Sequence, residues 1–295
     1  MENYKNINNC PVCNQGSFTD FLTAVDYTVS KDKFNIVICN SCGFHFTNPI
    51  PLESEIGNYY KSESYISHSS TNKGLINKIY QKVRNYTLKQ KVKLIQRLSS
   101  GKNHLDIGAG TGHFIDATSR AGFQSLGLEP DEDARNLAKK SFDVNIQPLD
   151  QLHKLDDSSM NVITMWHVLE HVYNLQNDLK KITSLLKDDG VMVVAVPNMN
   201  SYDAKKYKEF WAAYDLPIHL YHFTPNDIRT LFDQFNMEVK EILPMKFDSY
   251  YVSMLSEKYK GGNIFSAFFT GLKSNLKANP ETYSSQIYIL KKKRP

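Results

Sequence analysis

A glycine-rich turn between two carboxylates is the group of residues in this chain best suited to chemistry. Residues 104–112 read His-Leu-Asp-Ile-Gly-Ala-Gly-Thr-Gly, and residues 126–130 read Leu-Gly-Leu-Glu-Pro. The first run predicts a buried strand, a tight turn and the start of a helix, since alternating glycines let the backbone approach a ligand closely. Glu129 ends the next expected strand, where a ribose would lie. The pattern predicts a nucleoside site in a βαβ unit.

The residues around the turn distinguish between two kinds of nucleoside ligand. The dinucleotide fingerprint G-x-G-x-x-G places its third glycine at position 113, where this chain has His113. A pyrophosphate is an anion and prefers a helix N-terminus without competing carboxylates. Because Asp106 ends the first strand, the turn favours a nucleoside that carries positive charge.

The run D-I-G-A-G-T-G followed by Glu129 resembles the class I S-adenosylmethionine-dependent methyltransferases. The resemblance implies an α/β fold with a doubly wound, Rossmann-like sheet of seven strands. It implies that Asp106 lies beside the methionine moiety of S-adenosyl-L-methionine and that Glu129 binds the ribose hydroxyls. Asp150, with Gln151 as the alternate, matches the position that binds the adenine amino group. The implied cofactor-binding residues are Tyr65, His68, Asp106, Gly108, Ala109, Gly110, Glu129, Pro130, Asp150, Gln151 and His167.

Two of these residues come from a tyrosine-rich stretch at residues 59–68. It resembles a segment that lies over the cofactor in bacterial methyltransferases with N-terminal zinc knuckles, which implies contacts from Tyr65 and His68. Exposed loop aromatics are the alternative interpretation.

All four cysteines fall within the first 42 residues, in two C-x-x-C pairs. Each short loop directs two thiolates at one ion, so the pairs predict a tetrahedral structural zinc site in a small zinc ribbon. Residues 18–25 and 34–38 have the composition of its strands. An iron centre of the rubredoxin type is the alternative, and the module either supports the fold or recognises a macromolecule. The predicted ligands are Cys10, Cys13, Cys39 and Cys42.

The rest of the chain divides at changes in composition. Residues 1–58 form the predicted zinc-ribbon module, residues 59–103 the tyrosine-rich segment with basic amphipathic helices, and residues 104–295 the methyltransferase core. The basic segment has no acidic residue between Ser64 and Leu105. Its charged face is interpreted as solvated, with RNA, an anionic sugar nucleotide or a phospholipid surface as alternatives.

Strand and helix signals alternate after Glu129 as a doubly wound sheet requires. An antiparallel final strand pair is expected, with an aromatic insertion between its strands that could form an acceptor pocket or a contact between subunits. The expected strands are residues 144–146, 161–165, 191–196, 237–242 and 285–290.

Three histidines are the candidate catalytic residues, because they follow the fourth and fifth strands, where this architecture places its chemistry. They are His171, His219 and His222. Histidine can serve as a general base without special tuning of its pKa; loop histidines bonded to the backbone are the alternative. His167 and His171 are four residues apart and expected on one face of a short helix. A metal pair is not expected there, because no nearby motif completes a third ligand.

Composition limits the other classes. The chain has 295 residues, 41% of them hydrophobic, and a net charge of +4, so it can form a packed core and does not require a nucleic-acid partner. It lacks an apolar stretch of membrane-spanning length and a hydrophobic signal region, which predicts a cytoplasmic protein.

These patterns predict an enzyme that transfers the methyl group of S-adenosyl-L-methionine to a small-molecule acceptor, first of all a hydroxyl on a metabolite or sugar. One alternative is methylation of an RNA base, with the zinc ribbon and basic helix binding RNA. The other is a zinc-ribbon binding module whose second domain only senses the cofactor.

Overall fold

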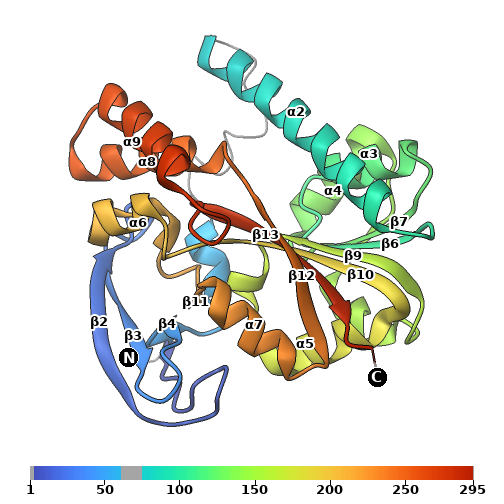
Figure 1. Cartoon of the computed structure of the whole chain (residues 1–295), viewed down its shortest axis with the longest axis horizontal. Helices are drawn as coiled ribbons and strands as arrows, with labels where there is room; N and C mark the ends of the chain where they lie inside the picture. The colour runs from blue at the N-terminus through green and yellow to red at the C-terminus, as the bar shows by residue number, and fades with distance from the viewer. Residues whose placement is uncertain (1–2, 61–74, 295) are drawn as a thin grey trace.

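A seven-stranded sheet forms the centre of the protein, as a computed structural model that describes residues 3–60 and 75–294 shows (Figure 1). The strand order is β12-β13-β10-β9-β6-β7-β8, and β13 runs antiparallel to both of its neighbours. This order and the antiparallel final pair confirm the predicted fold class. The strands are β6 (Asn103–Ile107), β7 (Gln124–Leu128), β8 (Ile146–Gln147), β9 (Met160–Trp166), β10 (Leu186–Pro197), β12 (Met237–Pro244) and β13 (Ser285–Lys292).

Helices cover both faces of the sheet because its central strands are apolar on both sides. Helices α2 (Leu75–Leu98) and α3 (His113–Arg120) pack on one face, through Ile95 and Phe114. Helices α5 (Leu175–Leu185) and α7 (Pro225–Asp233) pack on the opposite face. Helix α4 (Glu132–Phe142) links β7 to β8, and short 3-10 turns complete the core: η2 (Leu149–Lys154), η3 (Leu169–His171), η4 (Lys208–Phe210) and η5 (Ala212–Tyr214).

The N-terminal module contains an antiparallel sheet whose fourth strand comes from the predicted methyltransferase core. Strands β2 (Phe18–Val25), β3 (Lys33–Cys39) and β4 (His45–Thr47) are followed in the sheet by β11 (Tyr221–His222), which pairs with β4. Phe44 and Phe46 belong to the same hydrophobic cluster as Phe223. One sheet thus contains strands from both sides of residue 58. The predicted domain boundary at this residue stays a prediction. Strands β1 (Tyr4–Lys5) and β5 (Ile50–Pro51) pair separately, and η1 (Ile56–Tyr60) follows.

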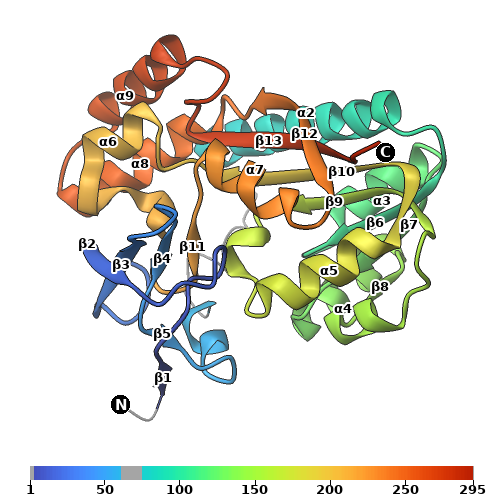
Figure 2. The ribbon, with the colours of Figure 1, turned by 60° about the horizontal axis from the view of Figure 1, so that its bottom comes forward.

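The insertion between the last two strands is helical. Helices α8 (Asp248–Lys260) and α9 (Ile264–Lys277) lie beside α6 (Tyr202–Tyr207), at the end of the molecule that also holds β2 (Figure 2). Among the residues described, no helix combines the length and the apolar character needed to cross a membrane.

Candidate functional site

The glycine turn connects β6 to α3 at the carboxyl edge of the sheet. Gly108 and Gly110 have φ angles of 73° and 52°, in the left-handed region where a side chain is strained. The amide groups of Gly108 and Ala109 donate to the carbonyl oxygen of Leu128 at 2.8 and 3.0 Å, which ties the turn to the end of β7. A Cβ atom at Gly108 would lie 2.3 Å from Cγ2 of Val168. The sequence therefore needs glycine here for both conformation and space.

Glu129 closes the turn from the next strand. Its Oε2 accepts a hydrogen bond from the amide of Gly110 at 2.8 Å, and its Oε1 accepts one from the amide of Asp131 at 3.0 Å. The side chain is buried, and burial raises its pKa although these amide groups oppose the shift. Pro130, which follows, is exposed and leads into α4. Gly110 and Glu129, which are both among the predicted cofactor-binding residues, are thus in direct contact.

Asp106 lies on the face of the sheet that α2 covers. Its Oδ1 accepts a hydrogen bond from Oγ1 of Thr164 at 2.5 Å, and Thr164 also lies 2.9 Å from Nε2 of His104. Burial raises the pKa of Asp106 to about 7, while burial lowers that of His104 to about 3. Asp106 is therefore a carboxyl group that gains or loses its proton near neutral pH.

Lys91 is a residue of this site that the sequence analysis missed. Its ammonium group lies 4.1 Å from the centre of the Trp166 ring, in cation–π geometry. Burial lowers the pKa of Lys91, and the negative charges of Asp248 and Asp106 oppose that shift. The signal was present, because Lys91 is spaced three residues after Leu88 and four before Ile95 on the apolar stripe of α2. The interpretation of the basic face as solvated is therefore wrong for Lys91, which packs on Trp166.

His167 sits between two carboxylates and not on the helix expected for it. The η3 turn begins at Leu169, and His167 precedes it with φ 56°. Its Nε2 lies 3.1 Å from Oδ2 of Asp248 and its Nδ1 lies 3.4 Å from Oε1 of Glu170. Burial would lower the pKa of His167, but these two carboxylates raise it to about 9. His167 is thus a cation at neutral pH. Asp248 comes from the insertion, where no sequence pattern marked it.

Two of the three candidate catalytic histidines lie together. The rings of His171 and His219 have centroids 4.6 Å apart. Nδ1 of His171 lies 2.9 Å from the carbonyl oxygen of Ile218, and Nδ1 of His219 lies 2.9 Å from that of Ala213. Burial lowers the pKa of both imidazoles, that of His219 well below its usual value. Both are neutral at physiological pH.

His222 has different surroundings. It lies in β11, and its Nε2 is 3.1 Å from Oγ1 of Thr47 in the N-terminal module. Burial lowers its pKa to about 3. His222 therefore lies against the module, and the hydroxyl of Thr47 that it contacts also donates to the carbonyl oxygen of His219 at 2.7 Å.

Asp150 and Gln151 are the second and third residues of the η2 turn, which follows β8 after Pro148, and Asp150 is exposed. Tyr65 and His68 lie outside the described residues.

The four cysteines meet at one point of the module. Their sulfur atoms all lie within 4.8 Å of one another, with Cys10 and Cys42 at 3.6 Å and Cys13 and Cys39 at 3.5 Å. A tetrahedral zinc ion with Zn–S bonds of about 2.3 Å separates its sulfur ligands by roughly 3.8 Å. Although burial opposes it, backbone hydrogen bonds lower the pKa of Cys39 to about 7. The residues therefore fit a zinc ion.

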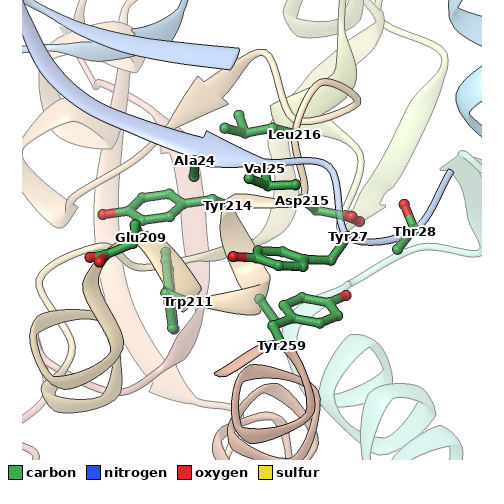
Figure 3. A pocket seen from close by; sticks show the side chains of 11 residues that line it. Ala24, Val25, Tyr27, Thr28, Glu209, Trp211, Tyr214, Asp215, Leu216 and Tyr259 are labelled. Atoms are coloured by element: carbon green, nitrogen blue, oxygen red, sulfur yellow. The ribbon is translucent and has the colours of Figure 1, made fainter. Parts of the chain in front are cut away.

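A small pocket between β2, η5 and α8 does not belong to this site. Tyr27 and Tyr259 stack in it with ring centroids 4.4 Å apart, and Asp215 and Trp211 also line it (Figure 3). Its volume of about 10 Å³ is space for about one water molecule. The pocket is therefore too small for a nucleoside or an organic acceptor.

Comparisons with known proteins agree with this geometry. The profile of the family described as "Methyltransferase domain" matches residues 80–242, more than half of the chain. The chain therefore belongs to this family, the class I S-adenosylmethionine-dependent methyltransferases. It is also similar to the ubiquinone biosynthesis O-methyltransferase of Rhodopseudomonas palustris, with 31% identity over 106 residues, which are 34% of this chain and 42% of that protein. The chain thus spans less than half the length of the curated relatives it matches.

Two solved structures share the fold at low sequence identity. Magnesium protoporphyrin IX methyltransferase from Synechocystis PCC 6803 has a TM-score of 0.53 and 13% identity, over 81% of this chain and all of that chain. A putative sarcosine dimethylglycine methyltransferase from Galdieria sulphuraria has a TM-score of 0.52 and 12% identity, over 71% of this chain and 85% of that one. These likenesses concern the fold alone.

The glycine turn yields a prediction about stability. Gly108→Ala should lower the free energy of unfolding by about 2–4 kcal/mol, because it combines left-handed strain of about 1–2 kcal/mol with a collision against Val168. Made in a Val168→Ala background, the same substitution should cost only about 1–2 kcal/mol. Denaturant unfolding of the four proteins of this cycle measures both values. Equal costs in the two backgrounds would contradict a collision with Val168.

Proposed function

We propose that the protein transfers the methyl group of S-adenosyl-L-methionine to a hydroxyl group of a small molecule. The observation that carries the proposal is the glycine turn held between Asp106 and Glu129 at the carboxyl edge of the sheet. The matched relatives are named as O-methyltransferases that act in ubiquinone biosynthesis, which supports an oxygen acceptor on a small molecule. Because the methyl donor is already activated, the protein mainly aligns donor and acceptor.

The charged groups of the site match the charges of the cofactor. Asp106 would accept the ammonium group of the methionine moiety, and Glu129 the ribose hydroxyls. The methionine carboxylate would meet Lys91 and the indole N–H of Trp166, a buried donor without a hydrogen-bond partner among the residues described. A buried donor of this kind is costly unless a ligand satisfies it.

The remaining cofactor contacts follow the carboxyl edge of the sheet. Asp150 or Gln151 would bind the adenine amino group, and Ala109 and Pro130 would line the cavity around the adenosine. His167 would form part of the wall of the cofactor pocket. The proposed contacts also include Tyr65 and His68.

His171 and His219 are the proposed general bases for a hydroxyl acceptor. Each is neutral, and each directs Nδ1 at a backbone carbonyl, which leaves the lone pair of Nε2 to accept a proton. His222 is a weak base, because burial lowers its pKa to about 3. Its contact with Thr47 suits a role in holding the loop.

A methyl-transfer assay tests the proposal. Protein incubated with S-adenosylmethionine labelled in its methyl group and with size-fractionated cell extract should transfer label to small molecules, and a catechol or other phenol should serve as a test acceptor. Label found only in RNA would support the RNA alternative, with strong salt dependence. Cofactor binding without transfer to any fraction would favour the cofactor-sensing alternative.

The protonation of Asp106 predicts how cofactor affinity depends on pH. The ammonium group favours the ionised carboxylate, so below about pH 7 binding must release the proton that Asp106 carries in the free protein. The Kd for S-adenosylmethionine should therefore rise as pH falls from 7 to 5, by up to about tenfold per pH unit.

The Asp106→Asn variant isolates this contribution. It should bind more weakly at pH 7 and lose most of the pH dependence, as measured by calorimetry. Asp188→Asn, at a side chain that is 99% exposed, is the matched control and should behave as the unmodified protein. An Asp106→Asn variant with the original pH slope would rule out this role.

The cysteine cluster is proposed to hold one structural zinc ion. Cys42→Ser should remove one equivalent of zinc per chain and lower the midpoint of thermal unfolding, because binding of a structural ion contributes to folding. Ser41→Ala, at an exposed position between Cys39 and Cys42, should keep the metal. Elemental analysis of the purified proteins measures the content, and unchanged zinc in Cys42→Ser would refute the assignment.

A further inference from the structure

Glu170, His171 and His219 form a second cluster of metal-ligating groups, apart from the cysteines. One potential ligand atom from each residue lies within 4.8 Å of the others. His171 follows Glu170 in the η3 turn, whereas His219 comes from the loop before β11. The amide of Leu220 donates to the carbonyl oxygen of Glu170 at 2.8 Å and fixes this loop beside the turn. The cluster is therefore held by backbone contacts.

The Nδ1 atoms of both imidazoles contact backbone carbonyl oxygens. Each has Nδ1 at 2.9 Å from a backbone carbonyl oxygen, Ile218 for His171 and Ala213 for His219. A carbonyl accepts only from a protonated nitrogen, so these contacts set the tautomer that leaves the Nε2 lone pair available. Metal-ligating histidines in proteins commonly donate their second ring nitrogen to a backbone carbonyl in this way. Tyr60, with its hydroxyl 3.0 Å from Nδ1 of His171, adds a further polar contact on the same side.

Glu170 supplies an independent observation that a cation belongs here. Its side chain is fully buried, and both carboxylate oxygens lack a hydrogen-bond partner among the described residues. The protonated ring of His167 pairs with Oε1, with 3.4 Å between Nδ1 and Oε1, which is longer than an ordinary charge-assisted hydrogen bond. Oε2 has no such partner among the described residues, and coordination of a cation would satisfy this buried oxygen.

We propose that Glu170, His171 and His219 bind a divalent first-row transition metal ion. Two imidazole nitrogens and one carboxylate oxygen are a donor set suited to zinc, iron or cobalt and not to magnesium or calcium, which prefer oxygen ligands alone. Three protein ligands leave coordination positions open, as at sites where a metal meets water or substrate.

The proposed site differs from the pair of His167 and His171, for which no nearby motif in the sequence completes a third ligand. The fold brings His219 from 48 positions further along the chain and replaces His167 with Glu170. Imidazoles that bind a metal no longer offer lone pairs as bases, so metal occupancy and the base role are alternatives. Metal binding itself rests on neither methyl transfer nor cofactor binding.

Cobalt(II) distinguishes the two sites, because thiolate ligands give an intense sulfur-to-cobalt charge-transfer band and nitrogen and oxygen ligands do not. Metal-depleted full-length protein titrated with cobalt(II) should bind two equivalents, only one of them with that band. Glu170→Gln should lose the second equivalent or weaken it more than about 100-fold and keep the thiolate band. His171→Gln should do the same, and it carries the test if Glu170→Gln does not fold.

His153→Ala is the matched control, since it removes a histidine whose side chain is 58% exposed; it should keep both equivalents. One bound equivalent in the unmodified protein, or a second equivalent that persists in both Glu170→Gln and His171→Gln, would overturn the proposal. Because no cofactor or acceptor is added, either result stands whether or not the protein transfers methyl groups.

Discussion

Burial of carboxylates at one edge of the sheet is the constraint on which the rest of the site depends. Asp106, Glu129 and Glu170 are all removed from water there, and a buried charge is costly unless it is paired or hydrogen-bonded. The hydroxyl of Thr164 bonds Asp106, and two backbone amides bond Glu129. Among the residues that the structure describes, the Glu170 side chain has only a contact of 3.4 Å with Nδ1 of His167. These buried carboxylates are therefore suited to bind cationic ligands.

Two charged residues of the site come from outside the central sheet, one from the helical insertion and one from helix α2. The local sequence patterns of these segments did not mark either residue as part of the site. Asp248 at the start of α8 pairs with His167, and Lys91 from α2 reaches Trp166 at the end of β9. Asp248 raises the pKa of His167 and opposes the lowering of the pKa of Lys91, and Lys91 opposes the rise in the pKa of Asp106. Charge interactions in the site therefore connect Lys91 and Asp248, which are 157 positions apart in the sequence.

The sequence predicted those features that depend on interactions between residues close together in the chain. Strand composition, the glycine turn and the spacing of the cysteines are short-range signals, and the sheet and the cysteine cluster agree with them. The helical insertion, the inward position of Lys91 and the meeting of His171 with His219 could not be predicted from one sequence. Each depends on which distant segments pack together, and an amphipathic pattern does not say which charged residue at the border of its stripe turns inward.

The pairing of β11 with β4 has a consequence for how this protein can change. Tyr221 faces Phe46 and His222 faces His45 across that pair, and a shift of one residue would turn both side chains to the opposite faces. An exchange of the module for another four-cysteine ribbon could restore the metal and still leave the loop that carries His219 out of register. The module and this loop must therefore be inherited, or redesigned, as one unit.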